Sequence, residues 1–305
     1  MTKPKKQKSK LRGPVPYIVL WVVVLTALFS ALLWGTNVKV LNPHGLIATH
    51  QLSLIIFSVV VLMVIAVPSL FLFYYFAWKY RETNTKVAHE SENHHGKWWV
   101  FWIWAIPCAI MLIMSVVMWI ATHKLDPMRA IASKNKTLHV QVIALRWKWL
   151  FIYPDQGIAT VNFLQAPVNT PIEFDLTADE TPMSSFWLPN WGGQLYAMTG
   201  HSNRLNLMPT TKGDFTGASA EINGAGFDGM KFTARASSQA DFNKWVTQTQ
   251  QSPNILDWVE YQKLLQPSEN NVAAFYSSTA PDMYDNVLMK YMGSHNMGAH
   301  STEHE

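Results

Sequence analysis

Three long apolar stretches mark the N-terminal part of the chain. Residues 13–38, 52–78 and 98–123 contain no Asp, Glu, Lys or Arg. A helix that crosses the hydrocarbon core of a bilayer needs about 20 apolar residues. The second and third stretches therefore predict membrane-spanning helices over residues 52–78 and 98–121. Tryptophans stand at both ends of the third stretch, as in the aromatic belts at membrane interfaces.

The first apolar stretch, within residues 1–36, has two interpretations. The basic residues before it suit either a membrane anchor or a secretory signal peptide. Its apolar core, residues 15–34, is longer than the roughly 7–15 residues usual in a signal peptide. The sequence therefore favours an uncleaved anchor and leaves cleavage open.

The basic residues near the spans predict their orientation. Six Lys and Arg residues lie in the first twelve positions, one lies in 36–51, and four lie in 79–97. Lys and Arg accumulate on the cytoplasmic side of membranes. The N-terminus and the 79–97 loop are therefore expected inside, and the C-terminal domain outside. A basic run directly before an apolar segment is typical of membrane topology, so we expect no nucleic-acid partner.

After residue 126 the hydrophobic pattern changes to a period of two. Apolar and polar residues alternate in 139–142, 172–176 and 204–207, and glycine-containing turns separate such runs. Short alternating runs without long helical patterns between them predict a β-sandwich or barrel. We therefore expect an all-β domain over residues 127–237, preceded by a transmembrane helical hairpin over residues 37–126.

A helical pattern returns at Ser238. Ser238 and Asp241 have the spacing of a capping box, and Phe242, Trp245 and Val246 follow on one helical face. Residues 255–265 and 281–292 are further helix candidates. The sequence thus predicts a helical C-terminal extension over residues 238–294 and a disordered, His-containing tail over residues 295–305.

Composition narrows the possible chemistry. Only 14% of the residues are charged, the net charge is +4, and Cys108 is the one cysteine. A single cysteine excludes an intrachain disulfide and any CxxC-type metal or redox site. The predicted spans 52–78 and 98–121 contain no Asp, Glu, Lys, Arg or His. Such residues mark ion and proton routes through membranes, so we expect no proton pathway within these spans.

Several motifs resemble those of subunit II of haem-copper terminal oxidases, in the same order and at similar spacing over most of residues 40–236. They comprise a pattern in the second hairpin helix, an aromatic strand, a Phe- and Pro-containing element, and a loop over 217–230. In this chain they read Trp104-x-x-Pro107, Trp147-Lys148-Trp149 with Phe151-Ile152-Tyr153-Pro154, and Ser184-Ser185-Phe186-Trp187-Leu188-Pro189. The resemblance implies a cupredoxin-like domain attached to a membrane hairpin.

In the copper-bearing branch of that family, the 217–230 loop holds a dinuclear copper centre, CuA. Its pattern is Cys-x3-Cys-x3-His-x2-Met with a second His upstream, because bridging thiolates and imidazoles suit copper. Glu221, whose family counterpart ligates through its carbonyl, and Met230 are retained here. Thiolates and imidazoles are not, so we predict that no metal binds. The corresponding positions are Ser184, Ser219, Glu221, Asn223, Phe227 and Met230.

The absence of these copper ligands is typical of the cytochrome bo type of ubiquinol oxidase. The stretches 151–154 and 226–232 also resemble that type. The resemblance implies a non-catalytic subunit II of a complex that oxidises ubiquinol, reduces oxygen to water and translocates protons. Haems and a copper are then expected in subunit I, which this chain scaffolds. Subunits III and IV and membrane lipid are further expected partners. The implied place is a bacterial inner membrane, with the C-terminal domain in the periplasm. We expect no cofactor and no catalytic residue in this chain.

Several alternatives stay open at this point. A subunit II of cytochrome c oxidase, with electron entry through this domain, and a tethered blue-copper carrier both require ligands that the β domain lacks. An orphan scaffold differs only in having no oxidase partner. Residues 33–36 carry no cysteine for lipid attachment, and residues 98–101 carry no carboxylate for proton entry. Also open are metal binding by the histidines of 89–95 and 295–304, the haem types, and the place of the quinol site.

Overall fold

The computed structural model describes residues 38–82, 84 and 96–298, together with residues 20, 21, 24, 27, 28 and 31; the side chains of 293–298 are not described. The chain divides into two compact units. One is Met1–Val38 with Leu54–Trp119, and the other is Lys39–Ser53 with Ile120–Glu305. Most of the predicted anchor or signal peptide, and the histidines of 89–95, lie outside the described residues.

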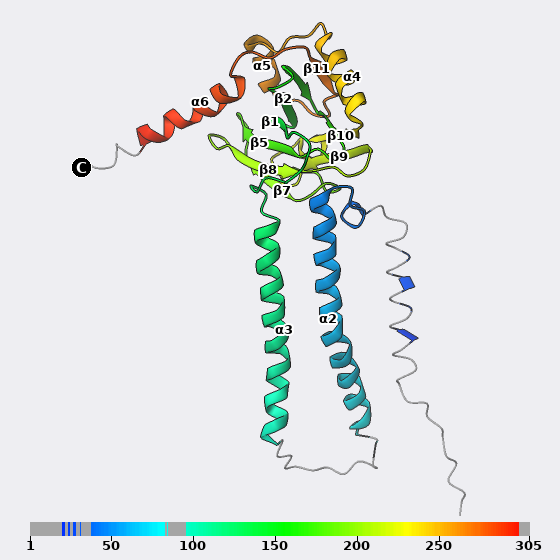
Figure 1. Cartoon of the computed structure of the whole chain (residues 1–305). Helices are drawn as coiled ribbons and strands as arrows, with labels where there is room; N and C mark the ends of the chain where they lie inside the picture. The colour runs from blue at the N-terminus through cyan, green and yellow to red at the C-terminus, as the bar shows by residue number, and fades with distance from the viewer. Residues whose placement is uncertain are drawn as a thin grey trace, which may run out of the picture. The chain divides into compact units, whose positions relative to one another are not determined.

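Two long helices make up most of the described part of the first unit, and each has one end in the second. Helix α2 is Leu46–Lys79 and helix α3 is Lys97–Lys124 (Figure 1). Both are long and apolar enough to cross a membrane, and both contain the predicted spans. Helix α2 starts six residues before the predicted position 52. Its first turns carry the polar residues Thr49, His50 and Gln51. A prediction based on the length of the apolar run therefore began too late.

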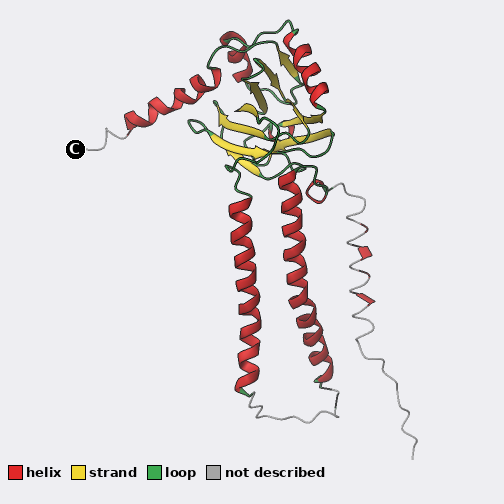
Figure 2. Cartoon of the chain, in the orientation of Figure 1, coloured by secondary structure: helices red, strands yellow, loops and turns green. Residues whose placement is uncertain are grey.

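The second unit contains two β-sheets (Figures 1 and 2). Within the described residues, one sheet has the strand order β11-β3-β2-β1-β5-β8 and the other β4-β10-β9-β6-β7. Strand β1 pairs in parallel with β5, and β4 with β10. The strands are β1 Leu138–Leu145, β2 Lys148–Tyr153, β3 Ile158–Val161, β4 Phe163–Pro167, β5 Ile172–Ala178, β6 Ser184–Trp187, β7 Gln194–Ala197, β8 Asn203–Leu207, β9 Gly213–Ser219, β10 Lys231–Ser237 and β11 Ala274–Tyr276.

One hydrophobic core lies between the two sheets. Trp149 and Phe151 of β2 contribute to it from the six-stranded sheet, and Phe186 and Phe232 contribute from the five-stranded sheet. The rings of Phe186 and Phe232 stack with their centroids 5.1 Å apart. Large aromatic side chains bury much apolar area and dominate such cores. The predicted all-β, cupredoxin-like sandwich is confirmed.

A second core lies on the other face of the six-stranded sheet. Ile143 of β1 and Leu150 and Ile152 of β2 pack there against Leu256, Leu265 and other residues of the C-terminal extension. Strand β2 is consequently buried at every position. A strand covered on both faces reads as a continuous hydrophobic run rather than an alternating one. The C-terminal extension therefore covers the outer face of the sheet.

The extension contains helices α4 Gln239–Gln250, α5 Trp258–Leu265 and α6 Met283–Gly298. The predicted cap is present, because Ser238 Oγ accepts the Asp241 N–H at 3.1 Å. Phe242, Trp245 and Val246 all pack against the first core, as predicted from their shared helical face.

The predicted helical extension is present, and the structure adds three features to it. The extension is not wholly helical, because its strand β11 pairs antiparallel with β3 at the edge of the six-stranded sheet. It also belongs to the same compact unit as residues 127–237. In addition, α6 continues to Gly298, past the predicted start of the tail at residue 295. Residues 299–305 lie outside the described residues.

Candidate functional site

The six positions that the motif resemblance matched to CuA ligands lie at the ends of two neighbouring strands and in the loop between β9 and β10. Strand β6 begins at Ser184, and the paired strand β9 ends at Ser219. The loop continues through Asn223 and through the 3-10 helix η2, Phe227–Gly229, to Met230. Ser184, Ser219, Asn223 and Met230 are buried, whereas Glu221 and Phe227 are partly exposed.

Hydrogen bonds link all six of these residues, and the Ser219 N–H donates to the Met230 carbonyl at 3.1 Å. The Asn223 amide donates from Nδ2 to Ser184 Oγ at 2.7 Å and to Met230 Sδ at 3.1 Å. Ser219 Oγ donates to the carbonyl oxygen of Glu221 at 3.0 Å. Phe227 is linked through the backbone, because its carbonyl accepts the N–H of Met230 at 3.0 Å. The structure thus brings the predicted positions together as one cluster.

The cluster presents hydrogen-bond donors where a metal would need acceptors. The Nδ2 protons of Asn223 are directed at Ser184 Oγ and Met230 Sδ, and the Ser219 hydroxyl proton is directed at the Glu221 carbonyl. Ser184 Oγ, Met230 Sδ and the Glu221 carbonyl are thus engaged, whereas Asn223 Oδ1 is buried without a hydrogen-bond partner. A copper pair is held by thiolates and imidazoles, and these side chains offer neither. Among the described residues, no group of three or more His, Cys, Asp or Glu side chains is arranged to hold a metal ion.

Two glycines fix the shape of the 217–230 loop. A Cβ atom on Gly217 would lie 2.1 Å from Cζ of Phe232, so only glycine fits beside that ring. Gly224 has a φ of 120°, a backbone conformation that residues other than glycine rarely adopt. The backbone of the loop is therefore constrained at both glycines.

The two tryptophans of the aromatic strand have different surroundings. Trp149 is fully buried and its ring meets Phe186 edge-on at 5.3 Å. Trp147 is partly exposed, has a left-handed φ of 61°, and lies against Gly224 and Gly226 of the loop. A bulky residue at positive φ persists only where its surroundings hold it there. Trp149 therefore packs in the core between the sheets, and Trp147 packs on the loop.

Comparison with known proteins places the chain in a family. The cytochrome bo(3) ubiquinol oxidase subunit 2 of Pseudomonas putida is 41% identical over 289 residues, which make up 95% of this chain and 88% of that protein. The ubiquinol oxidase subunit 2 of Acetobacter aceti is 40% identical over 273 residues, 88% of each chain. The chain belongs to the ubiquinol oxidase subunit 2 family. The resemblance predicted from the motifs is confirmed, and the cytochrome c oxidase alternative is less supported.

Two further matches concern parts of this subunit 2. A family model described as the COX Aromatic Rich Motif matches residues 250–295, within the C-terminal extension. The solved periplasmic domain of subunit II of cytochrome oxidase from Bradyrhizobium japonicum is 22% identical, covers 39% of this chain and 96% of its own, and has a TM-score of 0.37.

The extension of the subunit is attached through a buried carboxylate that the sequence did not indicate. Asp179, which follows β5, accepts hydrogen bonds from Tyr261 Oη and Tyr291 Oη, each at 2.6 Å, and from Lys290 Nζ at 3.0 Å. Burial and the neighbouring Asp179 charge raise the pKa of Tyr261. The donors lie 82 to 112 residues along the chain, so no local spacing reveals them. The cluster joins α5 and α6 to the sandwich.

Lys148 makes a second attachment between the aromatic strand and the extension. Its Nζ donates to the carbonyls of Leu264 and Gln266, each at 2.9 Å, at the end of α5. Cations favour helix C-termini because the last carbonyls there have no partner within the helix. Burial lowers the pKa of Lys148. The lysine of the Trp-Lys-Trp motif therefore caps a helix.

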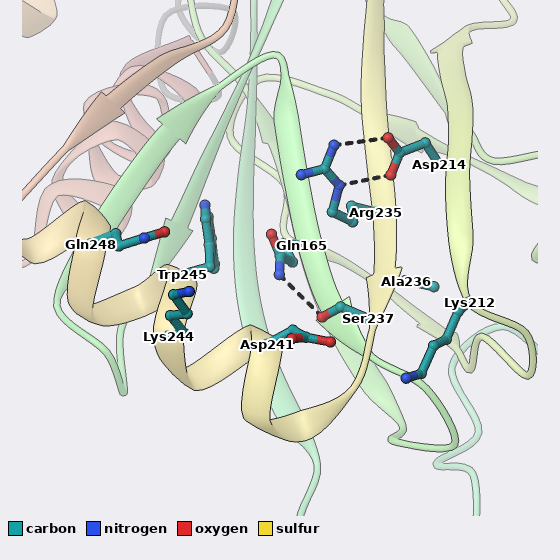
Figure 3. A pocket seen from close by; sticks show the side chains of 10 residues that line it. All are labelled: Gln165, Lys212, Asp214, Arg235, Ala236, Ser237, Asp241, Lys244, Trp245 and Gln248. Atoms are coloured by element: carbon teal, nitrogen blue, oxygen red, sulfur yellow. Dashed lines mark hydrogen bonds and ion pairs between the residues drawn. The ribbon is translucent and has the colours of Figure 1, made fainter.

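A cleft of about 400 Å³ lies beside α4 (Figure 3). Within it, Arg235 and Asp214 form a two-pronged ion pair of 2.7 and 2.8 Å, and Gln165 donates to Ser237 at 3.1 Å. The hydrogen bonds from Arg235 lower the pKa of Asp214. The second carboxylate, Asp241, is engaged with Ser238 at the start of α4. The polar groups of this cleft thus mainly join β10 to β9 and to β4, and cap the start of α4.

Proposed function

We propose that this subunit 2 is a copper-free scaffold, through which no electron enters the oxidase. In a ubiquinol oxidase, two quinol molecules reduce one oxygen molecule, giving two quinones and two waters. A lipid-soluble quinol reaches a haem-bearing subunit within the bilayer. A copper relay in the outer domain then has no electrons to carry.

One observation carries this proposal: an amide occupies the centre of the former metal site. Asn223 Nδ2 lies within hydrogen-bond distance of both Ser184 Oγ and Met230 Sδ. All three residues are buried. Buried polar groups that bond to one another gain stability without a ligand. The positions have therefore been converted from a ligand set to a packing element of the sandwich.

The haems and the catalytic copper are proposed to lie in subunit I. The two membrane helices of this chain would pack against that subunit, because most of their apolar side chains are exposed in the single chain. Exposed apolar surface of this extent is typical of a membrane or protein interface. Subunits III and IV, lipid and ubiquinol are the further partners that we propose for the assembled complex.

The proposed place is a bacterial inner membrane, with the C-terminal domain on the periplasmic side. The basic residues of the N-terminus and of the 79–97 loop support this orientation. The domain organisation that we propose is the one predicted from the sequence. It has an anchor or signal peptide in residues 1–36, a helical hairpin over 37–126, and an outer domain with its extension over 127–294.

Co-purification tests the scaffold role. The full chain, tagged at its C-terminus and expressed with the oxidase genes of its source, should purify with a haem-bearing subunit in a constant ratio. Membranes that lack this chain should lose quinol oxidase activity, and the wild-type chain should restore it. Purification without haem, or full activity without the chain, would contradict the proposal.

A further inference from the structure

The ends of the two membrane helices are attached to one strand of the outer domain. The N–H of Leu46, the first residue of α2, donates to the Met208 carbonyl at 3.0 Å. Asn206 donates its backbone N–H at 2.9 Å and Nδ2 at 3.0 Å to the Pro127 carbonyl, just past α3. Met208 directly follows β8, in which Asn206 lies. The residues that flank both helix ends are therefore fixed on one part of the domain surface.

Apolar side chains are exposed in both flanking segments. Before α2, Val40 is 39% exposed and Leu41 is 49% exposed, within the short helix η1, Lys39–Leu41. After α3, Met128 is 65% exposed. We name residues 39–42 and 124–136 the basal rim. Isolated exposed apolar residues are common on protein surfaces, but these three lie directly beside the ends of membrane helices.

Hydrogen bonds hold both segments of the rim in place. Asn190 Nδ2 donates to the carbonyls of Lys39 and Asn42, at 3.2 and 2.8 Å. On the other side, the Met128 N–H donates to Asp126 Oδ1 at 2.9 Å, and the Arg129 N–H donates to the Asp126 carbonyl at 3.0 Å. The backbone that carries the exposed apolar residues is thus held by hydrogen bonds.

The rim also carries an excess of positive charge. Asp126 is the one acidic residue of segments 39–42 and 124–136, and its carboxylate already accepts the Met128 N–H. One of the cations, Lys136, pairs with Asp155 at 2.9 Å. The positive-inside bias depletes Lys and Arg on the outer side of membranes. Basic residues found on that side therefore suggest a negatively charged partner. The basic residues of the rim are Lys39, Lys124, Arg129, Lys134 and Lys136.

The apolar length of α3 places the rim at the membrane surface. Residues 98–121 span about 36 Å at 1.5 Å per residue, slightly more than the hydrocarbon core of about 30 Å. Lys124 follows three residues later, at the depth of the headgroups. Lys and Arg beside a span extend their charged ends to lipid headgroups while their stems stay in apolar surroundings. Met128 lies in the turn that follows.

We propose that the basal rim binds anionic phospholipid of the outer leaflet. Val40, Leu41 and Met128 lie in the interface between headgroups and acyl chains, and the cations of the rim bind lipid phosphates. This contact sets the height of the outer domain above the bilayer. The inference rests on the proposed insertion of α2 and α3, which the experiment tests separately.

Spin labels on the purified oxidase complex, in nanodiscs of phosphatidylcholine with phosphatidylglycerol, measure the depth. In a Cys108→Ala chain, cysteine replaces Met128 or, as the matched control, Val272, which is 85% exposed on the extension. Collisions with oxygen, which concentrates in lipid, should exceed those with a water-soluble nickel chelate at position 128. The order should reverse at position 272. The complex with Cys108→Ala alone supplies the background of labels on other subunits.

A label on the native Cys108, which is exposed within α3, separates two kinds of failure. Nickel access at both 108 and 128 contradicts the insertion of α3, and with it the proposed function. Protection from nickel at 108 together with free access at 128 overturns the lipid contact alone. Protection of 128 from both reagents means that another subunit covers the rim, which also overturns the contact.

The charge requirement has its own test. The triple variant Lys39→Gln, Arg129→Gln, Lys134→Gln should retain less phosphatidylglycerol on the purified complex, by about fivefold for each cation removed. Retained phosphatidylcholine should be unchanged. The matched control neutralises three exposed lysines outside the rim, Lys231, Lys244 and Lys263. Equal loss of phosphatidylglycerol in the two triple variants, or no loss in either, overturns the proposal.

Discussion

Asn223 Nδ2 lies 2.7 Å from Ser184 Oγ, so a hydrogen bond joins two positions that the motif resemblance matched to copper ligands. The same amide reaches Met230 Sδ at 3.1 Å. A hydroxyl and a thioether are weak partners when left alone in a buried site, and the amide provides a donor for both. One internal donor therefore serves two buried acceptors of the cluster.

Replacement of Asn223 by Ala should destabilise the outer domain without affecting the reaction. The variant leaves two buried acceptors without their donor, which costs about 1–3 kcal/mol. Denaturant unfolding measures this cost, and Asn243→Ala on the exposed face of α4 should change stability by less than about 0.5 kcal/mol. Quinol turnover of the intact complex should be unchanged. A fall in turnover with the complex intact would assign the cluster a role in electron transfer.

Restoring the ligand types should restore copper binding. The loop keeps its backbone through Gly217 and Gly224, so the four lost side chains are the missing part. We expect the combined variant Ser184→His, Ser219→Cys, Asn223→Cys, Phe227→His to bind copper and to absorb in the near infrared. The matched control keeps both histidines but has Ala in place of the two cysteines, and it should bind none. A folded four-residue variant without copper would show that the loop has a different geometry.

Tyr261→Phe should change how the stability of the domain depends on alkaline pH. The pKa of Tyr261 is raised above 10.0 in the folded chain, by burial and then by Asp179. The folded chain then keeps a proton that the unfolded chain loses above about pH 10, so its contribution is complete below pH 10 and declines as pH rises. The variant should reduce that decline by about 1.4 kcal/mol per pH unit.

The same variant has a cost at neutral pH. Tyr261→Phe removes one of three donors to a buried carboxylate, which we expect to cost about 1.5–3 kcal/mol at pH 7. Other buried tyrosines, Tyr153 and Tyr284, also have a raised pKa and continue to titrate in the variant. Stability curves at pH 7 and at pH 10–11 measure both effects. An unchanged alkaline slope would mean that folding does not raise the pKa of Tyr261.

Lys148→Met should loosen the extension while leaving the sandwich folded. Methionine keeps a similar shape but cannot donate to the carbonyls of Leu264 and Gln266, and the loss is expected to cost about 1–3 kcal/mol. Amide hydrogen exchange should accelerate in α5 and remain slow in β2 and β10. Lys231→Met, on the exposed side of β10, is the matched control. Equal acceleration in all these elements would contradict a local capping role.

The sequence predicted the features that depend on local pattern. The apolar runs predicted α2 and α3, alternation predicted the β domain, and Ser238 with Asp241 predicted the start of α4. The pairing of β11 with β3 was not predicted, because Ala274 and Val161 are partners across more than a hundred residues. The three donors to Asp179 are hidden for the same reason. The motif resemblance located Ser184, Asn223 and Met230, but only the structure shows that they bond to one another.

The metal content and electron donor of the purified complex test the central claim most directly. Copper should be found at one atom per complex, all in the haem-bearing subunit, with rapid turnover on ubiquinol and none on reduced cytochrome c. The copper content of the complex should not fall when Asn223 or Met230 is replaced. Two additional coppers bound within residues 137–236, together with turnover on reduced cytochrome c but not on quinol, would contradict the account.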